Sequence, residues 1–502
     1  MASDPPASPA SDPSCSEAQE RRRSLAWVAG AVLASLALRL PSLRAPLTVD
    51  EAGALTVARS WAAGQRLYVD TFVDRPQGVI VAFQRWDAWF GPSPAAVRSL
   101  ALVAGVTTVL GAAVAARAIA GRWTAGAVSA WLVAVVASSA AIEGHAANGE
   151  LLAGAATVPA AAIGALVAAR RVRAPWLLAA GALAAAGITV KQSGFDVLAA
   201  LGLWIVVAGF AGWVPRRHAF AMAGWLIAGA GIVLGTAAWH GAQLGWDAYG
   251  YALYGFRVHA RSAIAGPQGG RMILTLLVAL PLLGPAVAIA VRRLRRLDPP
   301  LRTHLRPEHG VVLLWTAVSL LGFFAGGNYH RHYWIQLVFP VAVACGIATA
   351  SGPRQTERAL VRSTALALAL PLVISLVLIA RPTIEQDPRV AADAAIARWF
   401  EQHRPAPDSD LLPLCASVTW YVDVGQLPRT PYLWVDHVRA GRGSIPRLLA
   451  LLEGPDRPTY LAMHQPADRC DPTGRLVRAI DRHYRRVATV DGVPILAARP
   501  TG

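Results

Sequence analysis

The sequence predicts an all-α polytopic membrane protein that ends in a small α/β domain. Of its 502 residues, 55% are hydrophobic and only 15% are charged, whereas a soluble domain carries about 25% charged residues. Uncharged runs of roughly 17 to 21 residues recur along the chain, and a helix of this length crosses a hydrocarbon core of ~30 Å. These two observations exclude a soluble enzyme, a disordered protein and a fibrous protein.

The charge of the chain is strongly positive, with 47 Lys and Arg against 30 Asp and Glu, a net charge of +17. In a soluble chain this excess would suggest nucleic acid. Here the arginines gather between apolar runs, so they bear on membrane orientation and we expect no nucleic-acid partner. Lys191 is the single lysine of the sequence.

The N-terminal region predicts a disordered cytoplasmic tail, residues 1–23, followed by a retained first span. Residues 1–20 are rich in Pro, Ser, Ala and acidic residues, a composition typical of disorder. Arg21, Arg22 and Arg23 then precede the apolar run 24–40. This order resembles a signal peptide, but the small-residue cleavage site is unconvincing.

The transmembrane domain is expected over residues 24–381, with about eleven transmembrane helices. After the first run, the candidate spans are 97–116, 123–142, 151–169, 174–190, 197–214, 219–239, 272–291, 310–328, 333–352 and 363–380. Arginine clusters fall in every second loop between them, and cytoplasmic loops carry the excess of Arg. We therefore expect a cytoplasmic N-terminus in a bacterial inner membrane, with outer loops 41–96 and 240–271 and an extracytoplasmic C-terminal segment.

Residues 382–502 predict that small extracytoplasmic α/β domain. Short β-like runs alternate with helical patterns there, the β-like runs being 411–415, 459–463, 487–490 and 494–498. Cys415 and Cys470 both lie in this segment. Outside the cytoplasm they could form a disulfide, and two separate buried thiols are the alternative.

The first outer loop contains the acidic pair Asp50 and Glu51 directly after the first span. Neighbours on a helix point about 100° apart, so the two carboxylates cannot share one role. Thr48 and Glu51 fit the capping box S/T-x-x-E, which leaves Glu51 either a helix cap or a functional residue. A carboxylate at the membrane surface is costly unless it is wet or paired, so Asp50 is the stronger functional candidate.

The same loop continues into an amphipathic helix with Val79, Phe83, Trp86 and Phe90 on one face. Spacings of four, three and four residues are typical of a helix lying on a membrane surface. Such a helix could roof a site at the bilayer boundary or simply anchor the loop.

Other charged residues are expected on the same outer side as Asp50. They are Asp74 with Arg75, Lys191, the group Arg257, His259 and Arg261, and the group His330, Arg331 and His332. Cations beside acidic groups at the bilayer surface suit a lipid-linked phosphate that carries a reactive group, although ordinary snorkelling of Arg and Lys is the alternative. Asp74 and His259 could form part of a divalent metal site. On a helix, His330 and His332 would face different directions.

Four features together resemble the polytopic glycosyltransferases of the GT-C type, most of all the family-39-like members related to protein O-mannosyltransferases and to the lipid A aminoarabinose transferase. They are Asp50-Glu51 after the first span, the stretch Gly64 to Asp70 leading to Asp74-Arg75-Pro76-Gln77-Gly78, Lys191 after the fifth span, and His332-Tyr333 followed by Pro340. The resemblance covers most of residues 24–380. It implies a GT-C-like fold.

The resemblance also implies roles for individual residues. The acidic residue after the first span is the family's catalytic carboxylate, which implies this role for Asp50 with Glu51 as its neighbour. Arg75 occupies the place of the basic residue that contacts the donor phosphate, although members more often have Lys followed by two prolines. Asp74 matches a position that helps to hold a metal in some members, and Arg257 or Arg261 corresponds loosely to a basic residue of the second loop.

The implied reaction is transfer of a hexose or pentose from a polyprenyl-phosphate donor to a hydroxyl of a glycan, lipid or protein acceptor. A departing phosphate requires positive charge, which Arg75, Lys191 and Arg257 or Arg261 would supply. Asp50 would take the proton of the acceptor hydroxyl, and a single displacement would invert the sugar carbon. Apart from a divalent metal, no cofactor is expected.

Two other functions compete with this interpretation. A transporter or flippase for a lipid-linked or anionic substrate predicts polar residues at the bilayer midplane and paired broken helices, whereas the polar residues here gather at one outer face. A non-catalytic scaffold with an outer sensor domain leaves the Asp50 loop unexplained.

Overall fold

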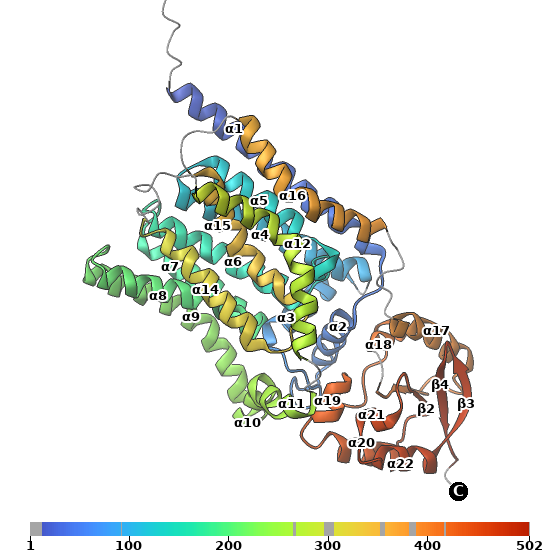
Figure 1. Ribbon diagram of the computed structural model, residues 1–502. Coiled ribbons are helices and arrows are strands. Elements are labelled where there is room, and N and C mark those ends of the chain that lie inside the picture. The colour runs from blue at the N-terminus through green and yellow to red at the C-terminus, as the bar shows by residue number, and fades with distance from the viewer. Residues whose placement is uncertain are drawn as a thin grey trace, which may run out of the picture.

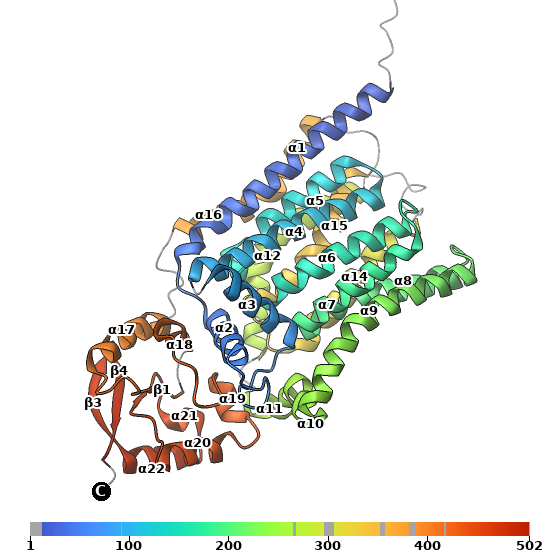
Figure 2. The same ribbon diagram turned by 180° about the vertical axis from the view of Figure 1, so that it is seen from behind.

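The computed structural model consists of a helical bundle and a C-terminal α/β domain at one end of it (Figure 1). It describes residues 13–91, 93–264, 268–295, 306–351, 357–380, 388–415 and 418–500. Figure 2 shows from behind that the helices α2, α3 and α11 lie at the same end of the bundle as that domain.

Eleven apolar helices form the bundle in the described part of the chain. They are α1 (Pro13–Arg39), α4 (Pro94–Ala120), α5 (Trp123–Val136), α6 (Gly149–Ala168), α7 (Leu177–Val190), α8 (Asp196–Phe210), α9 (Arg216–Leu244), α12 (Gln268–Arg295), α14 (His309–Gly326), α15 (Trp334–Ala350) and α16 (Glu357–Ala380). By length and composition, eight helical segments can cross a membrane, and three apolar helices are shorter. Together they correspond to the eleven expected spans, so the all-α polytopic fold is confirmed.

Part of the expected disordered tail is helical. Helix α1 begins at Pro13, so residues 13–23 are helical, while residues 1–12 lie outside the described residues. The charged stretch Arg21 to Arg23 therefore extends the first span instead of preceding it. A helix that has already nucleated in an apolar run continues at little further cost through good helix formers such as Arg, Glu and Gln.

Close packing within the bundle relies on small residues. A Cβ atom at Gly181 of α7 or at Gly229 of α9 would collide with the backbone of the other helix, at Leu226 and Leu178 respectively. Without side chains at these points, the two helix backbones approach closely, as is typical of membrane helix pairs.

Two helices follow the first span within the expected outer loop 41–96, α2 (Val49–Ala62) and α3 (Gln77–Phe90). Helix α3 is the amphipathic helix that the sequence predicts. Val79 and Phe83 are buried, and the Trp86 indole nitrogen donates to Ala96 O at 2.8 Å. Phe90 at the end of the helix remains 58% exposed. The first three residues of the apolar face thus pack inward, and Trp86 ties α3 to the start of α4.

The second outer segment consists of α10 (Trp246–Gly250), a π-helical turn η5 (Tyr251–Gly255) and α11 (Phe256–Ile264). Phe256 and Ala260 of α11 are buried, whereas Val258 is 77% exposed. One face of α11 therefore packs inward.

The C-terminal domain is an α/β domain, as the sequence predicts. A four-stranded sheet runs in the order β1-β2-β4-β3, with β1 and β2 parallel and the other pairs antiparallel. The strands are β1 (Leu411–Pro413), β2 (Tyr460–Ala462), β3 (Tyr484–Val490) and β4 (Val493–Ala498). The helices are α17 (Pro388–His403), α18 (Thr419–Val424), α19 (Val435–Ala440), α20 (Ser444–Glu453), α21 (Ala467–Cys470) and α22 (Arg475–His483).

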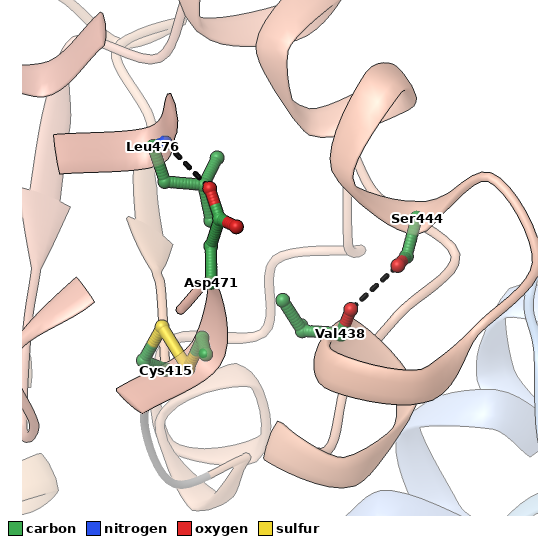
Figure 3. Close-up of a disulfide and its surroundings, with 6 residues drawn as sticks. Cys415, Val438, Ser444, Asp471 and Leu476 are labelled. Carbon is green, nitrogen blue, oxygen red and sulfur yellow. Dashed lines mark hydrogen bonds between the residues drawn. A yellow bond between two sulfur atoms is a disulfide. The ribbon is translucent and has the colours of Figure 1, made fainter. Parts of the chain in front are cut away.

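A disulfide joins Cys415, just after β1, to Cys470 at the end of α21, 55 residues further along the chain (Figure 3). It decides between the two alternatives for these cysteines. Disulfides persist in oxidising compartments, which agrees with an extracytoplasmic position. Beside it, Leu476 N donates to the Asp471 carboxylate at 2.9 Å and fixes the start of α22.

Candidate active site

The start of α2 places Asp50 and Glu51 on different sides of the helix. Thr48 is the N-cap, its hydroxyl accepts from Glu51 N at 3.2 Å, and Glu51 Oε2 accepts from Thr48 N at 2.9 Å. The predicted capping box is therefore confirmed.

The Glu51 side chain is only 1% exposed and has further buried partners. Glu51 Oε1 lies 2.9 Å from Arg98 Nε and accepts from Ala147 N at 2.8 Å. This carboxylate joins α2 to α4 and to the loop before α6. Its contacts are those of a structural residue.

Asp50 faces Arg75 on the other side of α2. Arg75 Nη2 lies 3.1 Å from Asp50 Oδ2, and the Asp50 side chain is 41% exposed. The surrounding protein raises the pKa of Asp50, but Arg75 and two nearby histidines lower it more, so that it lies below its ordinary value. The carboxylate is therefore ionised at neutral pH and reaches solvent.

A second ion pair lies next to the first in sequence. Asp74 Oδ2 lies 2.9 Å from Arg257 Nη2 of α11, and Asp74 Oδ1 lies 3.4 Å from His437 Nε2 of the C-terminal domain. Burial raises the pKa of Asp74, but Arg257 and His437 outweigh it and hold the pKa well below its usual range.

A third acid–base pair consists of Lys191 and Glu150. Lys191 follows the last residue of α7, and its ammonium pairs with Glu150 in the first turn of α6. The ammonium also lies 4.2 Å from the centroid of the Tyr333 ring. A cation over an aromatic face is stabilised by the ring quadrupole. The Glu150 side chain is 1% exposed, so solvent does not reach the Glu150 carboxylate of this pair.

Gly149 brings the first and third pairs together. A Cβ atom at this position would lie 3.4 Å from Lys191 Cδ and 3.8 Å from Arg75 Nη1. Both cationic side chains therefore pass the N-terminus of α6 close to the space that a side chain at position 149 would fill. We call Arg75, Lys191 and Arg257 the cation cluster.

His332 connects the acidic groups around this cluster. Its Nδ1 lies 2.8 Å from Glu143 Oε2, and its Nε2 lies 3.7 Å from Glu150 Oε1. Arg331 Nη2 is 3.5 Å from the other Glu143 oxygen. A histidine between two carboxylates holds both of them in place.

The expectation that His330 and His332 face different directions is wrong. Their rings stack, with centroids 5.4 Å apart and planes 4° from parallel. The physical reason is the backbone. His330 is extended and precedes the short 3₁₀ helix η6 (Arg331–Tyr333), so α-helical angular spacing does not apply.

The predicted metal pair Asp74 and His259 is not formed. His259 is exposed on α11, and the histidine that contacts Asp74 is His437. On a helix, positions two apart point about 200° apart, so the pairing of Arg257 with Asp74 turns His259 away.

The residues around Asp74 do not fit a divalent metal. Such ions prefer several oxygen ligands, but the Asp74 carboxylate already pairs with the Arg257 guanidinium on one oxygen and with His437 on the other. Within the described ranges, no group of three or more His, Cys, Asp or Glu could hold a metal ion. Arg261 belongs to α11, and its side chain lies outside the described residues.

The sequence-based prediction missed Glu143, Glu150 and His437. A signal existed for the two glutamates, because the alternation of basic loops places the segment 143–150 on the outer side with Asp50. We know of no local pattern that would have marked His437, since its role depends on how the C-terminal domain packs.

The comparisons identify the fold. No family model and no curated protein matches the sequence. Among solved structures, ArnT from Cupriavidus metallidurans bound to undecaprenyl phosphate matches with a TM-score of 0.64 at 15% identity, over 95% of this chain and 99% of that one. The chain has an ArnT-like fold. The GT-C type of architecture that the sequence features indicated is thereby confirmed.

The ArnT-like fold is shared more distantly with the oligosaccharyltransferase AglB from Archaeoglobus fulgidus. Its complex with an inhibitory peptide and a dolichol-phosphate matches with a TM-score of 0.57 at 12% identity, over 92% of this chain and 72% of that one. A complex of the Archaeoglobus fulgidus oligosaccharyltransferase with Zn and sulfate matches with a TM-score of 0.55 at 12% identity, over 87% and 67% of the two chains. At these identities the comparisons establish the fold.

Proposed function

We propose that this chain is a membrane glycosyltransferase that moves a sugar from a polyprenyl-phosphate donor to an acceptor hydroxyl at the extracytoplasmic face. The observation that carries the proposal is the partly exposed, ionised Asp50 carboxylate beside the cation cluster. Asp50 belongs to α2, which lies at the end of the bundle where the C-terminal domain lies. The ArnT-like fold supports it, because ArnT binds undecaprenyl phosphate and AglB binds a dolichol-phosphate in their structures.

The cation cluster would hold the donor phosphate. Arg75 and Arg257 can each offer two parallel N–H donors to phosphate oxygens, whereas Lys191 acts as a compact charge. Each of the three cations is paired with one carboxylate. These acids hold the cations close together before substrate binds, so little reorganisation is needed when negative charge develops.

The chemical step is a single displacement. Asp50 takes the proton from the acceptor hydroxyl, and the acceptor oxygen attacks the anomeric carbon of the sugar. The bond from that carbon to the phosphate oxygen breaks, and its electron pair leaves with the polyprenyl phosphate. Attack opposite to the leaving group inverts the configuration. Arg75 Nη2 lies 3.1 Å from Asp50 Oδ2. The Arg75 guanidinium can therefore contact both the base and the departing phosphate.

Glu51 and the metal have no part in this scheme. Glu51 holds the start of α2 through Thr48, Arg98 and Ala147, so it fixes the direction of Asp50. We assign no step to a divalent ion, since Asp74 is paired with Arg257 and His437. The transferred group would be a hexose or a pentose, and the acceptor a glycan, a lipid or a protein.

The transporter alternative finds less support. It predicts charged groups midway along the helices and paired broken helices. The three acid–base pairs of the cluster instead involve helix ends and outer loops: Asp50 and Glu150 lie in the first turns of α2 and α6, and Lys191 follows α7. This placement suits chemistry at the membrane surface.

The test is transfer of a labelled sugar. Purified protein is incubated with membrane extract and a panel of radiolabelled polyprenyl-phosphate sugars, and the labelled acceptor fraction is then identified. We expect transfer from at least one donor, and loss of it in Asp50→Asn. The matched control is Asp70→Asn, because Asp70 lies in the same loop and pairs with the exposed Arg66 instead of with the cation cluster. Failure of every donor, or full transfer by Asp50→Asn, would overturn the proposal.

A further inference from the structure

Residues 431–442 of the C-terminal domain, which we call the docking segment, contact the outer loops of the bundle. Phe72 N donates to Pro431 O at 3.0 Å, and Phe72 and Tyr432 form an isolated β-bridge. Arg442 at the far end lies 3.1 Å from Asp247. Helix α19, within this segment, lies beside α11 in both views (Figures 1 and 2). The two parts of the molecule are thus joined next to the cation cluster.

His437 is the residue of the docking segment that reaches the cluster. Its side chain is 4% exposed, and its ring packs edge-on against Phe72 and Phe256, with centroids 4.9 and 5.1 Å apart. The Trp434 ring packs against a third side of the His437 imidazole, with the ring centroids 4.9 Å apart. Aromatic contacts of this geometry hold a ring firmly. The imidazole is thereby fixed with its Nε2 directed at Asp74.

The Asp74 carboxylate has one partner on each oxygen. Oδ1 lies 3.4 Å from His437 Nε2, and Oδ2 lies 2.9 Å from Arg257 Nη2. A carboxylate held at one oxygen cannot rotate freely, so the partner of the other oxygen is also restrained. His437 therefore acts on Arg257 through Asp74, without a contact to Arg257 of its own among the described interactions.

The anchor of His437 is itself rigid. Figure 3 shows the Ser444 hydroxyl donating to Val438 O, which ties the middle of α19 to the first residue of α20. The Cys415–Cys470 disulfide constrains the domain behind it. A rigid support of this kind is what a precisely held side chain requires.

We propose that His437 is a positioning residue, supplied by the C-terminal domain, that orients Asp74 and so presents Arg257 to the donor phosphate. The donor site is then complete only when the docking segment is in place. This inference rests on the proposed function, since it assumes that Arg257 binds a polyprenyl phosphate.

The experiment measures binding of a short-chain polyprenyl phosphate without sugar to the purified full-length protein, together with kcat and the separate donor and acceptor KM values. His437→Phe keeps the aromatic packing and removes the contact to Asp74. His437→Gln restores a side-chain N–H donor. Arg442→Ala is the matched control, because it weakens the same interface at exposed Asp247 without touching the cluster.

We expect His437→Phe to weaken polyprenyl phosphate binding about tenfold, the effect of losing one charge-assisted hydrogen bond. The donor KM should rise in parallel while the acceptor KM stays within about twofold. His437→Gln should recover most of the affinity, and Arg442→Ala should stay within about twofold of wild type.

Each other outcome would decide against the inference. Wild-type affinity in His437→Phe would show that His437 does not act on the phosphate site. Equal losses in His437→Phe and Arg442→Ala, or a His437→Gln variant no better than His437→Phe, would show that the segment only docks the domain. If wild type binds no polyprenyl phosphate, the proposed function fails and this inference fails with it.

Discussion

The two faces of α2 differ in what surrounds their carboxylates, although Asp50 and Glu51 are neighbours in the chain. The Asp50 face opens toward solvent and the cation cluster, and the Asp50 side chain is 41% exposed. The Glu51 face is sealed against Arg98 and Ala147, with both members of the ion pair 1% exposed. A charge in the first setting is available for chemistry, whereas in the second it is bound into the structure.

The comparison predicts opposite phenotypes for two conservative substitutions. Asp50→Asn should lower turnover about 10²- to 10⁴-fold, the usual contribution of a general base, with little change in melting temperature because the site is partly hydrated. Sugar transfer and thermal unfolding in detergent would measure both. An Asp50→Asn protein that unfolds many degrees earlier would show that the open face is structural after all.

Glu51→Gln should mainly cost stability. The amide keeps the shape of the cap but leaves Arg98 without a counter-charge in a buried position, which typically costs about 3–5 kcal/mol. Asp87→Asn is the control, because Asp87 of α3 pairs with Arg59 of α2 at a similar distance of 2.9 Å, but both side chains are about one-fifth exposed. That change should cost about 1 kcal/mol or less. Equal shifts of the two unfolding midpoints would remove the distinction between the faces.

Truncating the cation cluster should affect the donor more than the acceptor. For Arg75→Ala and Lys191→Ala we expect the donor KM to rise about tenfold or more, since each loses one charged contact to phosphate. The acceptor KM should change by about twofold at most. Steady-state kinetics with each substrate varied separately gives both values. Parallel increases for donor and acceptor would contradict a phosphate role.

The smallest expected effect concerns pH. Arg75 and the neighbouring histidines outweigh burial and hold the pKa of Asp50 below its ordinary value, which is about 3.9 for an aspartate. A lowered pKa means that the base is lost only as the pH falls through that low value. The acid limb of kcat/KM should therefore lie below about pH 4. An acid limb near pH 6 would show that Asp50 is not held ionised by its neighbours.

The spans and most of the cluster were predictable from the sequence because the signals are local. Apolar runs and alternating arginines define helices and their sides without knowledge of packing. Asp50, Arg75, Lys191 and Arg257 were placed on one side, and the structure brings them close together. The capping box was also readable, because it involves residues three positions apart.

The contacts of the remaining residues could not be predicted, for physical reasons. Glu150 follows the N-cap Asn148, where an acidic residue normally serves only the helix dipole. The stacking of His330 on His332 depends on an extended residue before η6. His437 and Asp74 are 363 positions apart in the sequence. The periodicity of a single segment cannot predict a contact between the bundle and the C-terminal domain.

Gly53 has a consequence for how this molecule can be altered. The Trp434 indole of the docking segment occupies the space that a side chain at position 53 would need, one turn along the helix from Asp50. A C-terminal domain exchanged for this one must therefore supply an indole at that point or leave a gap against the helix. With Trp434 in place, even alanine at position 53 would push the indole and the docking segment outward.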